Sequence, residues 1–280
     1  MKKIVNQNFP NERDLYNLSN LTLENCSFKG EEDGESALKE CKNVTLNNCV
    51  MDLRYPLWHA KKIVKQNSEK TVNCRASLWY VNNAVIKNCL FNGIKSLREC
   101  KNITVENSKI NSAEFCWRTK GIKVNNSDIS GEYAFFECKD LQIENLQFSG
   151  KYSFQYCKNL TITNSTLNTK DAFWHAENVV VKDSVVSGEY LGWYSKNLVF
   201  ERCIIKGTQP LCYCKNLKLI DCKMENTDLS FEYSEVEADI KGEILSVKNV
   251  LKGKVIADKI GEIIAEDSKY LLSAQIIERK

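Results

Sequence analysis

Hydrophobic and polar residues alternate along most of this chain in short runs that recur every 19 residues. Each repeat has two aliphatic positions separated by one residue, and then Ser or Cys, with Asn, Asp, Gly or Ser between the runs. Alternation with a period of two indicates β-strands, and the polar residues between the runs indicate turns. The chain is therefore predicted to be a repeat protein of short strands. The most regular repeats begin at residues 100, 119, 138, 157, 176, 195 and 214.

The pattern also extends toward the N-terminus, where repeats begin at Leu18, Cys41, Ala60 and Val81. The repeat at Ala60 has two extra residues, and the one at Leu18 has four, within GEEDGESA. Eleven coils, one per repeat, thus cover residues 18–232. We expect residues 1–17 to form an N-terminal cap and residues 233–280 to form shorter coils and a C-terminal cap, all within one domain, 1–280.

Nineteen residues are too few for helical repeats of about 34 residues, and the leucine-rich pattern and a six-residue sub-period are absent. We predict an all-β fold, a right-handed single-stranded parallel β-helix with three strands per coil and about eleven coils. Successive coils would lie about 4.8 Å apart. The similar segments 240–250 and 251–261 predict eleven-residue turns that narrow the C-terminal end.

Stacking turns each coil position into a column. Positions 4 and 6 are aliphatic and are predicted to be interior. Positions 1 and 9 hold ten of the thirteen cysteines. Metal or redox chemistry would explain such columns, but small residues that fill tight interior rows explain them better. Asn at positions 3 and 8 predicts turn ladders. Position 2 is a column of lysines, for which a solvated edge is favoured over a polyanion site.

Positions 18 and 19 carry the most informative side chains. All five tryptophans fall at position 18, in line with Arg98 and Gln155, whereas position 19 is polar or ionisable throughout. We expect the chain to bend there, so that both columns reach a surface groove. The alternative is a surface that a terminal segment or a second subunit covers, with the aromatic residues as ladders between coils.

An aromatic groove with acids, arginines and histidines suits an acidic oligosaccharide, since arginines hold carboxylates by bidentate contacts. Glu99 and Glu137 would lie about 9.6 Å apart along the axis, at the upper edge of the separation of an inverting glycosidase pair. Arg118 between them would lower both pKa values, so simple ion pairing is the alternative. The candidate catalytic residues are Glu99, Glu137 and His175, and the candidate substrate-binding residues are Arg98, Trp117, Arg118, Tyr156, Trp174, Trp193 and Tyr194.

The remaining composition excludes several classes. The two histidines are six coils apart and cannot share a metal, and we predict no metal and no cofactor. A net charge of +3 in 280 residues argues against a general nucleic-acid binder. No apolar run approaches the ~18 residues of a membrane span, and the N-terminus has no apolar core of a signal peptide. These features predict a cytoplasmic protein with no membrane and no nucleic-acid partner.

The repeat resembles the pectin-lyase-like superfamily of right-handed β-helices. More narrowly, YPLWH (55–59), AFWH (172–175), GEYLGWYS (188–195) and GTQPLCYC (207–214) resemble a bacterial family of unknown function over essentially the whole chain. The calcium-binding aspartates of the lyases and the paired aspartates of the polygalacturonases are absent. A glycoside hydrolase or polysaccharide lyase is therefore implied by fold analogy only.

Two functions remain open at this level. The first is a cytoplasmic carbohydrate-active or carbohydrate-binding β-helix, acting as a hydrolase or lyase on acidic oligosaccharides in the aromatic groove. The second is a non-enzymatic protein-interaction or scaffold β-helix that uses the same aromatic face, including self-association as a homo-oligomer.

Overall fold

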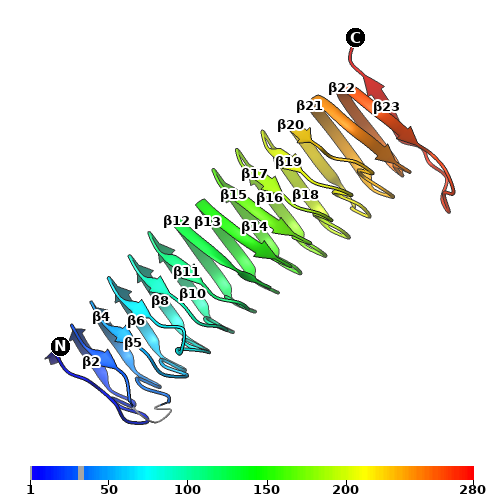
Figure 1. The fold of residues 1–280 in the computed structure, drawn as a ribbon. Coiled ribbons are helices and arrows are strands. Elements are labelled where there is room, and N and C mark those ends of the chain that lie inside the picture. Colours follow the sequence, from blue (N-terminus) through cyan, green and yellow to red (C-terminus); the bar gives the residue numbers. More distant parts are fainter. Residues whose placement is uncertain (1, 31–34) are drawn as a thin grey trace. The chain divides into compact units, whose positions relative to one another are not determined.

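The computed structural model describes residues 2–30 and 35–280, so part of the insertion in the first coil, residues 31–34, lies outside the described residues. The chain divides into two compact units, Met1–Leu146 and Gln147–Lys280. Every regular element of the described residues is a β-strand, and the strands of successive coils pair in parallel (Figure 1). The described residues include no helix with the length and hydropathy of a membrane span.

In the first unit, most coils contribute one six-residue strand and one shorter strand. Lys101 of one coil pairs with Lys120 of the next, which confirms the 19-residue period. The strands are β1 (Lys2–Val5), β2 (Ser19–Glu24), β3 (Ser27–Phe28), β4 (Lys42–Asn47), β5 (Val50–Met51), β6 (Lys61–Gln66), β7 (Glu69–Lys70), β8 (Asn82–Lys87), β9 (Leu90–Phe91), β10 (Lys101–Glu106), β11 (Lys109–Asn111), β12 (Lys120–Glu132) and β13 (Lys139–Lys151), of which the last continues into the second unit.

The second unit keeps the same period until its last strands. Glu177 pairs with Lys196, whereas Glu235 pairs with Lys252 and Glu243 with Lys259, so the final coils are 17 and 16 residues long. The further strands are β14 (Lys158–Thr163), β15 (Thr166–Lys170), β16 (Glu177–Lys182), β17 (Val185–Ser187), β18 (Lys196–Glu201), β19 (Ile204–Lys206), β20 (Leu217–Glu225), β21 (Glu235–Lys248), β22 (Lys252–Ile264) and β23 (Gln275–Glu278).

The parallel β-helix is confirmed, but with about 14 turns rather than eleven. β1, within the predicted N-terminal cap, already pairs with β2 at an offset of 19 residues. β21, β22 and β23 extend the stack at the other end. Eleven-residue turns were wrong, because segment 240–250 covers the end of β21 whereas segment 251–261 covers most of β22. The two similar segments therefore do not stack on each other.

The interior columns follow the predicted positions. Ile103 and Val105 are buried, and all thirteen cysteines are buried and free. At position 9, the Cys89 thiol contacts the carbonyl of Lys87 at 3.2 Å, and the Ser108 hydroxyl donates to the carbonyl of Glu106 at 2.7 Å. Cys and Ser thus satisfy the same backbone carbonyl in a tight interior column, which supports the packing explanation.

The third segment of each coil is a series of turns and not the predicted third strand. At positions 15, 17 and 19 of one coil, Glu114, Cys116 and Arg118 have φ values of 55°, 59° and 51°. Alternate left-handed residues reverse the direction of successive N–H groups. Cys116 donates to Ser96 of the preceding coil at 2.8 Å, whereas Arg118 donates to Phe136 of the next coil at 2.8 Å. This bend places position 17 inside and positions 18 and 19 at the surface.

Two lysines break the interior pattern of the first unit. Lys65 stands at position 6, which was predicted to be aliphatic, and both it and Lys70 have 0% exposure. The Lys70 ammonium donates to the carbonyl of Cys74 at 2.8 Å and to the Ser77 hydroxyl at 3.1 Å, and also to Ser96. The coil that contains both lysines has two extra residues, and its Cys74 carbonyl faces the ammonium. Burial lowers the pKa of Lys70 to about 8.

Candidate functional site

The tryptophans of the first unit form a stacked ladder at position 18. The rings of Trp58 and Trp79 are 4.9 Å apart and nearly parallel, at 7°. The Arg98 guanidinium lies 4.5 Å from the Trp79 ring centre and 4.6 Å from that of Trp117. The Trp117 indole N–H donates to the carbonyl of Tyr133 at 2.6 Å. Neighbouring coils therefore cover much of the ring faces, while each ring remains half-buried.

The second unit repeats this arrangement with Trp174 and Trp193, whose rings are 5.4 Å apart at 6°. Their indole N–H groups donate to carbonyls of the next coil at 2.6 and 2.8 Å. Gln155 takes the same place one coil earlier and donates to the carbonyl of Asp171 at 3.0 Å. A hydrogen bond from position 18 to the next coil is thus a structural role that tryptophan and glutamine share.

A second ladder runs beside it at position 19 of the second unit. The rings of Tyr156, His175, Tyr194 and Tyr213 are stacked 4.9, 5.0 and 4.8 Å apart, with interplanar angles of 9°, 9° and 14°. Tyr156 is 45% exposed and Tyr194 is 46% exposed. Because stacking covers the ring faces, the ladder presents ring edges and polar groups to solvent.

The charges at the same positions of the first unit are largely paired. Arg98 donates to Glu114 at 2.8 Å, and Glu114 also lies 3.5 Å from Lys95. Arg118 donates from Nε to Glu137 at 2.8 Å. This bond and the charge of Glu99 raise the pKa of Arg118. Arg118 therefore lies between two carboxylates, as the sequence predicts, and holds one of them in an ion pair.

The predicted site residues fall into two groups. The first unit holds Arg98, Glu99, Trp117, Arg118 and Glu137, whereas the second holds Tyr156, Trp174, His175, Trp193 and Tyr194. The predicted catalytic set is thus divided between the units, with Glu99 and Glu137 in one and His175 in the other. These assignments stay predictions. Among the described residues, no group of three or more His, Cys, Asp and Glu side chains is arranged to hold a metal ion.

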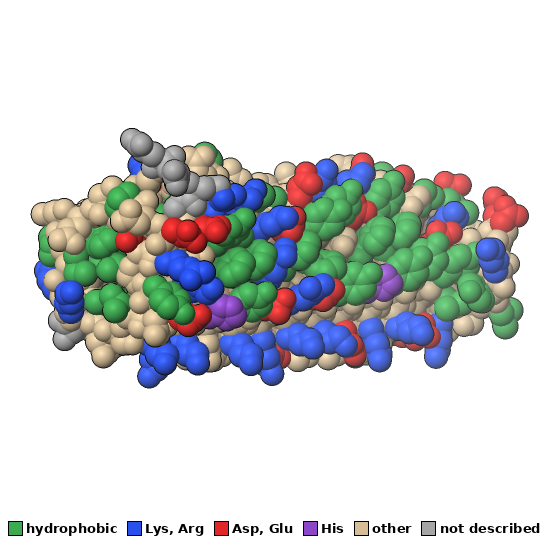
Figure 2. Space-filling model, turned by 90° about the horizontal axis from the view of Figure 1, so that it is seen from below, with side chains coloured by type: hydrophobic (Ala, Val, Ile, Leu, Met, Phe, Trp, Pro, Cys, Tyr) green, Lys and Arg blue, Asp and Glu red, His purple; other side chains and the backbone are tan. Residues whose placement is uncertain are grey.

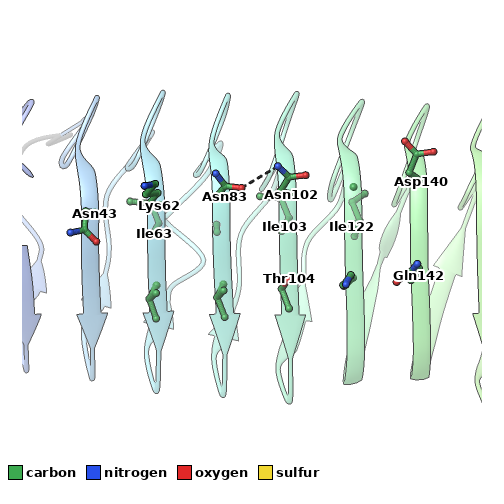
Figure 3. Close-up of a pocket in the computed structure, with 15 residues that line it drawn as sticks. Asn43, Lys62, Ile63, Asn83, Asn102, Ile103, Thr104, Ile122, Asp140 and Gln142 are labelled. Atoms are coloured by element: carbon green, nitrogen blue, oxygen red, sulfur yellow. Dashed lines mark hydrogen bonds between the residues drawn. The ribbon is translucent and has the colours of Figure 1, made fainter. Parts of the chain in front are cut away.

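The first unit also has a groove that sequence reasoning missed, with a volume of about 650 Å³ (Figure 3). It crosses six successive coils, from β4 to β13, at coil positions 3 to 5. Val64, Val85 and Thr104 form one row along it, at position 5. The other residues that line it are Asn43, Lys62, Ile63, Asn83, Ala84, Asn102, Ile103, Gly121, Ile122, Lys123, Asp140 and Gln142.

The asparagine ladder along this groove is broken. Asn102 donates to Asn83 at 3.1 Å, but Lys62 and Gly121 stand at position 3 of the flanking coils. Within the described residues, this leaves the amide N–H of Asn83 and the amide oxygen of Asn102 without a partner. A Cβ at Gly121 would lie 2.9 Å from that oxygen, so the glycine keeps it accessible. Two interruptions in a column of asparagines were the sequence signal that could have located the groove.

The ladder at the same position of the second unit is continuous. Asn178 donates to Asn159 at 3.1 Å, Asn197 to Asn178 at 2.8 Å, and Asn216 to Asn197 at 2.9 Å. Each of these amides therefore bonds its neighbour, and the ladder serves the stack alone. The comparison marks the free amide groups of the first unit as a feature beyond what the fold needs.

The sequence profile of one protein family, described as "Protein of unknown function (DUF3737)", matches residues 2–277. No match was found among curated protein sequences.

Several solved structures are similar at low scores. PfbA, a surface adhesin of Streptococcus pneumoniae, is 10% identical, with a TM-score of 0.38 over 94% of this chain and 84% of its own. A tailspike protein mutant of an E. coli bacteriophage, in complex with a pentasaccharide, is 10% identical, with a TM-score of 0.42 over 97% of this chain and 66% of its own. The catalytic domain of GH87 alpha-1,3-glucanase, in complex with nigerose, is 10% identical, with a TM-score of 0.39 over 99% of this chain and 63% of its own. Such values transfer no activity to this chain.

Proposed function

This chain belongs to the family described as "Protein of unknown function (DUF3737)", and we propose that its first unit binds an oligosaccharide in the groove over β4 to β13. The observation that carries the proposal is the broken asparagine ladder, which leaves one amide donor and one amide acceptor at the groove. Sugar hydroxyls both donate and accept hydrogen bonds, and so they match this pair. Ligand sites of this kind combine a mostly apolar lining with a few placed polar groups.

The row at position 5 suits the less polar face of a sugar ring. The side chains of Val64, Val85 and Thr104 present methyl groups along the groove, in successive coils. Because coils lie about 4.8 Å apart, six coils extend over about 24 Å. An elongated groove of this length accommodates a chain of several sugar units better than a single compact ligand.

The charges at the groove favour an acidic chain. Lys62 and Lys123 line it, and neither has a carboxylate within ion-pair distance among the described residues. Asp140, which supplies a carboxylate to the lining, lies 3.6 Å from the Lys120 ammonium. This pairing makes Asp140 a poor proton donor, so the proposal is binding and does not include hydrolysis.

The groove is better suited to a sugar than the tryptophan ladder. Sugar rings stack on exposed ring faces, but stacked neighbours cover much of the faces of Trp79 and Trp174. The two arginines of the predicted site are already paired with Glu114 and Glu137. The predicted acidic-oligosaccharide site at positions 18 and 19 would require these ion pairs to open.

A titration of the full chain tests the groove. Neutral and uronic oligosaccharides are added to wild type, Asn102→Leu and the matched variant Asn178→Leu, and binding is followed by calorimetry. Asn102→Leu should weaken binding about tenfold, because each lost hydrogen bond contributes about 1 kcal/mol. Asn178→Leu changes the equivalent position of the second unit and should leave the affinity unchanged. Equal effects of the two variants, or no binding of any sugar, would overturn the proposal.

We propose protein association through the second unit as a second function. Its stacked ladder exposes the edges of Tyr156, His175 and Tyr194, beside the half-buried Trp174 and Trp193. Tyrosine and tryptophan are enriched in protein interfaces, where they offer large contact areas with a polar tip. This observation supports the predicted interaction surface and its use by a second copy of the chain.

A further inference from the structure

A row of exposed lysines runs along the first unit at position 2, next to the asparagine ladder. Lys42 pairs directly with Lys61 across neighbouring strands, and Lys101 pairs with Lys120. Like charges directly opposite each other destabilise a sheet. The fold alone gives no reason to place them together. We call Lys42, Lys61, Lys101, Lys120 and Lys139 the lysine row.

The lysine row has little neutralising charge. Among the described residues, Lys120 has an acidic partner, Asp140, at 3.6 Å, but the other four lysines have no carboxylate within ion-pair distance. The nearest acidic column, position 19, contributes Glu40, Glu99 and Glu137. Glu40 accepts a hydrogen bond from Tyr16 at 3.0 Å, and Glu137 is held by Arg118. Figure 2 shows Lys and Arg side chains gathered along one border of a face rich in hydrophobic side chains.

The same column of the second unit is neutralised. Glu177 occupies position 2 there, 2.9 Å from the Lys158 ammonium and 3.9 Å from the Lys196 ammonium. The chain also pairs opposite charges across strands elsewhere, such as Lys206 with Glu225 at 2.7 Å. A repeat that readily places glutamate beside lysine has thus left it out of the lysine row.

We infer that the lysine row binds a linear polyanion that carries sulfate or phosphate groups and no bases. A stack of coils places the ammonium groups at intervals of about 5 Å or its multiples, which a repeating anionic chain can follow. Proteins that bind single-stranded nucleic acids stack the bases on aromatic ring faces. Here the rings of Trp58 and Trp79 cover each other. The inference stands on charge alone and does not depend on sugar binding in the groove.

Salt-dependent binding tests this inference. Labelled dextran sulfate and inorganic polyphosphate are titrated into the full chain at several salt concentrations, with neutral dextran and a single-stranded oligonucleotide for comparison. Lys42→Gln/Lys61→Gln/Lys101→Gln is the test variant, and Lys158→Gln/Lys196→Gln/Lys215→Gln is its matched control in the second unit. Both remove three exposed charges and leave the interior intact. Equal thermal stability of the two variants excludes unfolding as a cause.

We expect the affinity for both polyanions to fall steeply with salt. The logarithmic slope for a single-stranded polyanion changes by about 0.7 for each lysine that no longer binds an anionic group. The test variant should therefore reduce the slope by about 2 and the affinity at least tenfold, whereas the control keeps both. Preference for one polyanion identifies sulfate or phosphate as the natural group. Equal losses in the two variants, equal binding of neutral dextran, or tighter binding of the oligonucleotide at equal charge would overturn the inference.

Discussion

At the scale of single residues, the buried lysines of the first unit carry the largest electrostatic cost. The Lys70 ammonium donates hydrogen bonds to one carbonyl and two hydroxyls, all of them neutral groups. Phe91 lies beside it, with the ring centre 5.6 Å from the ammonium. Hydrogen bonds to neutral groups replace only part of the hydration that a charge loses on burial. Lys70 is therefore predicted to reduce stability at neutral pH.

The first prediction concerns the pH dependence of this cost. The pKa of Lys70 is about 8 when folded, and an unfolded lysine titrates near 10.4, so the unfolded chain binds more protons in between. Stability from Lys70 should thus rise between pH 8 and pH 10.5 by about 3 kcal/mol, and the penalty is fully present below pH 8. Urea unfolding of wild type and Lys70→Met at both pH values measures it. A constant difference between the two proteins would show that Lys70 is charged throughout.

The second prediction concerns Glu137. Its ion pair with Arg118 is 41% and 50% exposed, and such pairs contribute less than about 1 kcal/mol. Glu137→Gln should therefore leave the free energy of unfolding nearly unchanged, and the affinity for sugars in the groove should also be retained. The predicted acid/base role requires, in addition, that any turnover of an acidic oligosaccharide is lost. A variant with full turnover would remove Glu137 from the mechanism.

At the scale of elements, the asparagine ladder links stability to the groove. Each amide that bonds its neighbour stabilises the corner of a coil, where position 3 adopts a left-handed conformation. Asn102 has a φ of 56° there, and Gly121 has a φ of 71°. Asparagine tolerates this region better than most residues with a side chain. Completing the ladder is therefore sterically feasible, although the Asn102 amide must shift to admit a Cβ.

The third prediction follows for Gly121→Asn. The new amide should donate to Asn102 and raise the free energy of unfolding by about 0.5–1 kcal/mol. It also occupies the free oxygen of Asn102, so the affinity for sugars should fall. Thermal unfolding and calorimetry on the same samples measure both effects. A variant that is more stable and binds as well as wild type would separate the ladder from the site.

At the scale of the whole molecule, the aromatic ladders and the lysine row are surfaces that only stacking creates. The fourth prediction concerns association. If the exposed stack of the second unit binds a second copy, the mass measured by sedimentation should rise with concentration. Tyr156→Ser/Tyr194→Ser should abolish this rise, whereas Tyr80→Ser, at the same position in the first unit, should not. A constant monomeric mass of the wild-type chain would contradict self-association.

Much of the molecule follows from the 19-residue period. The spacing places Ile103 above Ala84 and below Ile122, and it brings Lys101 opposite Lys120. Interior columns, cysteine columns and asparagine ladders are therefore predictable from the sequence. Lys65 is the exception, because nothing in a single lysine shows that a lengthened coil buries it in the interior.

The sequence by itself determined the type of fold and the membership of each column, since both depend only on spacing and on the alternation of side chains. The tertiary structure decided what each column can do. Left-handed residues at alternate positions set the direction of the tryptophans, and stacking then covered their faces. The break in the ladder at Lys62 and Gly121 became a groove only when the flanking coils enclosed it. These properties depend on dihedral angles and on contacts between distant residues, which the local pattern does not specify.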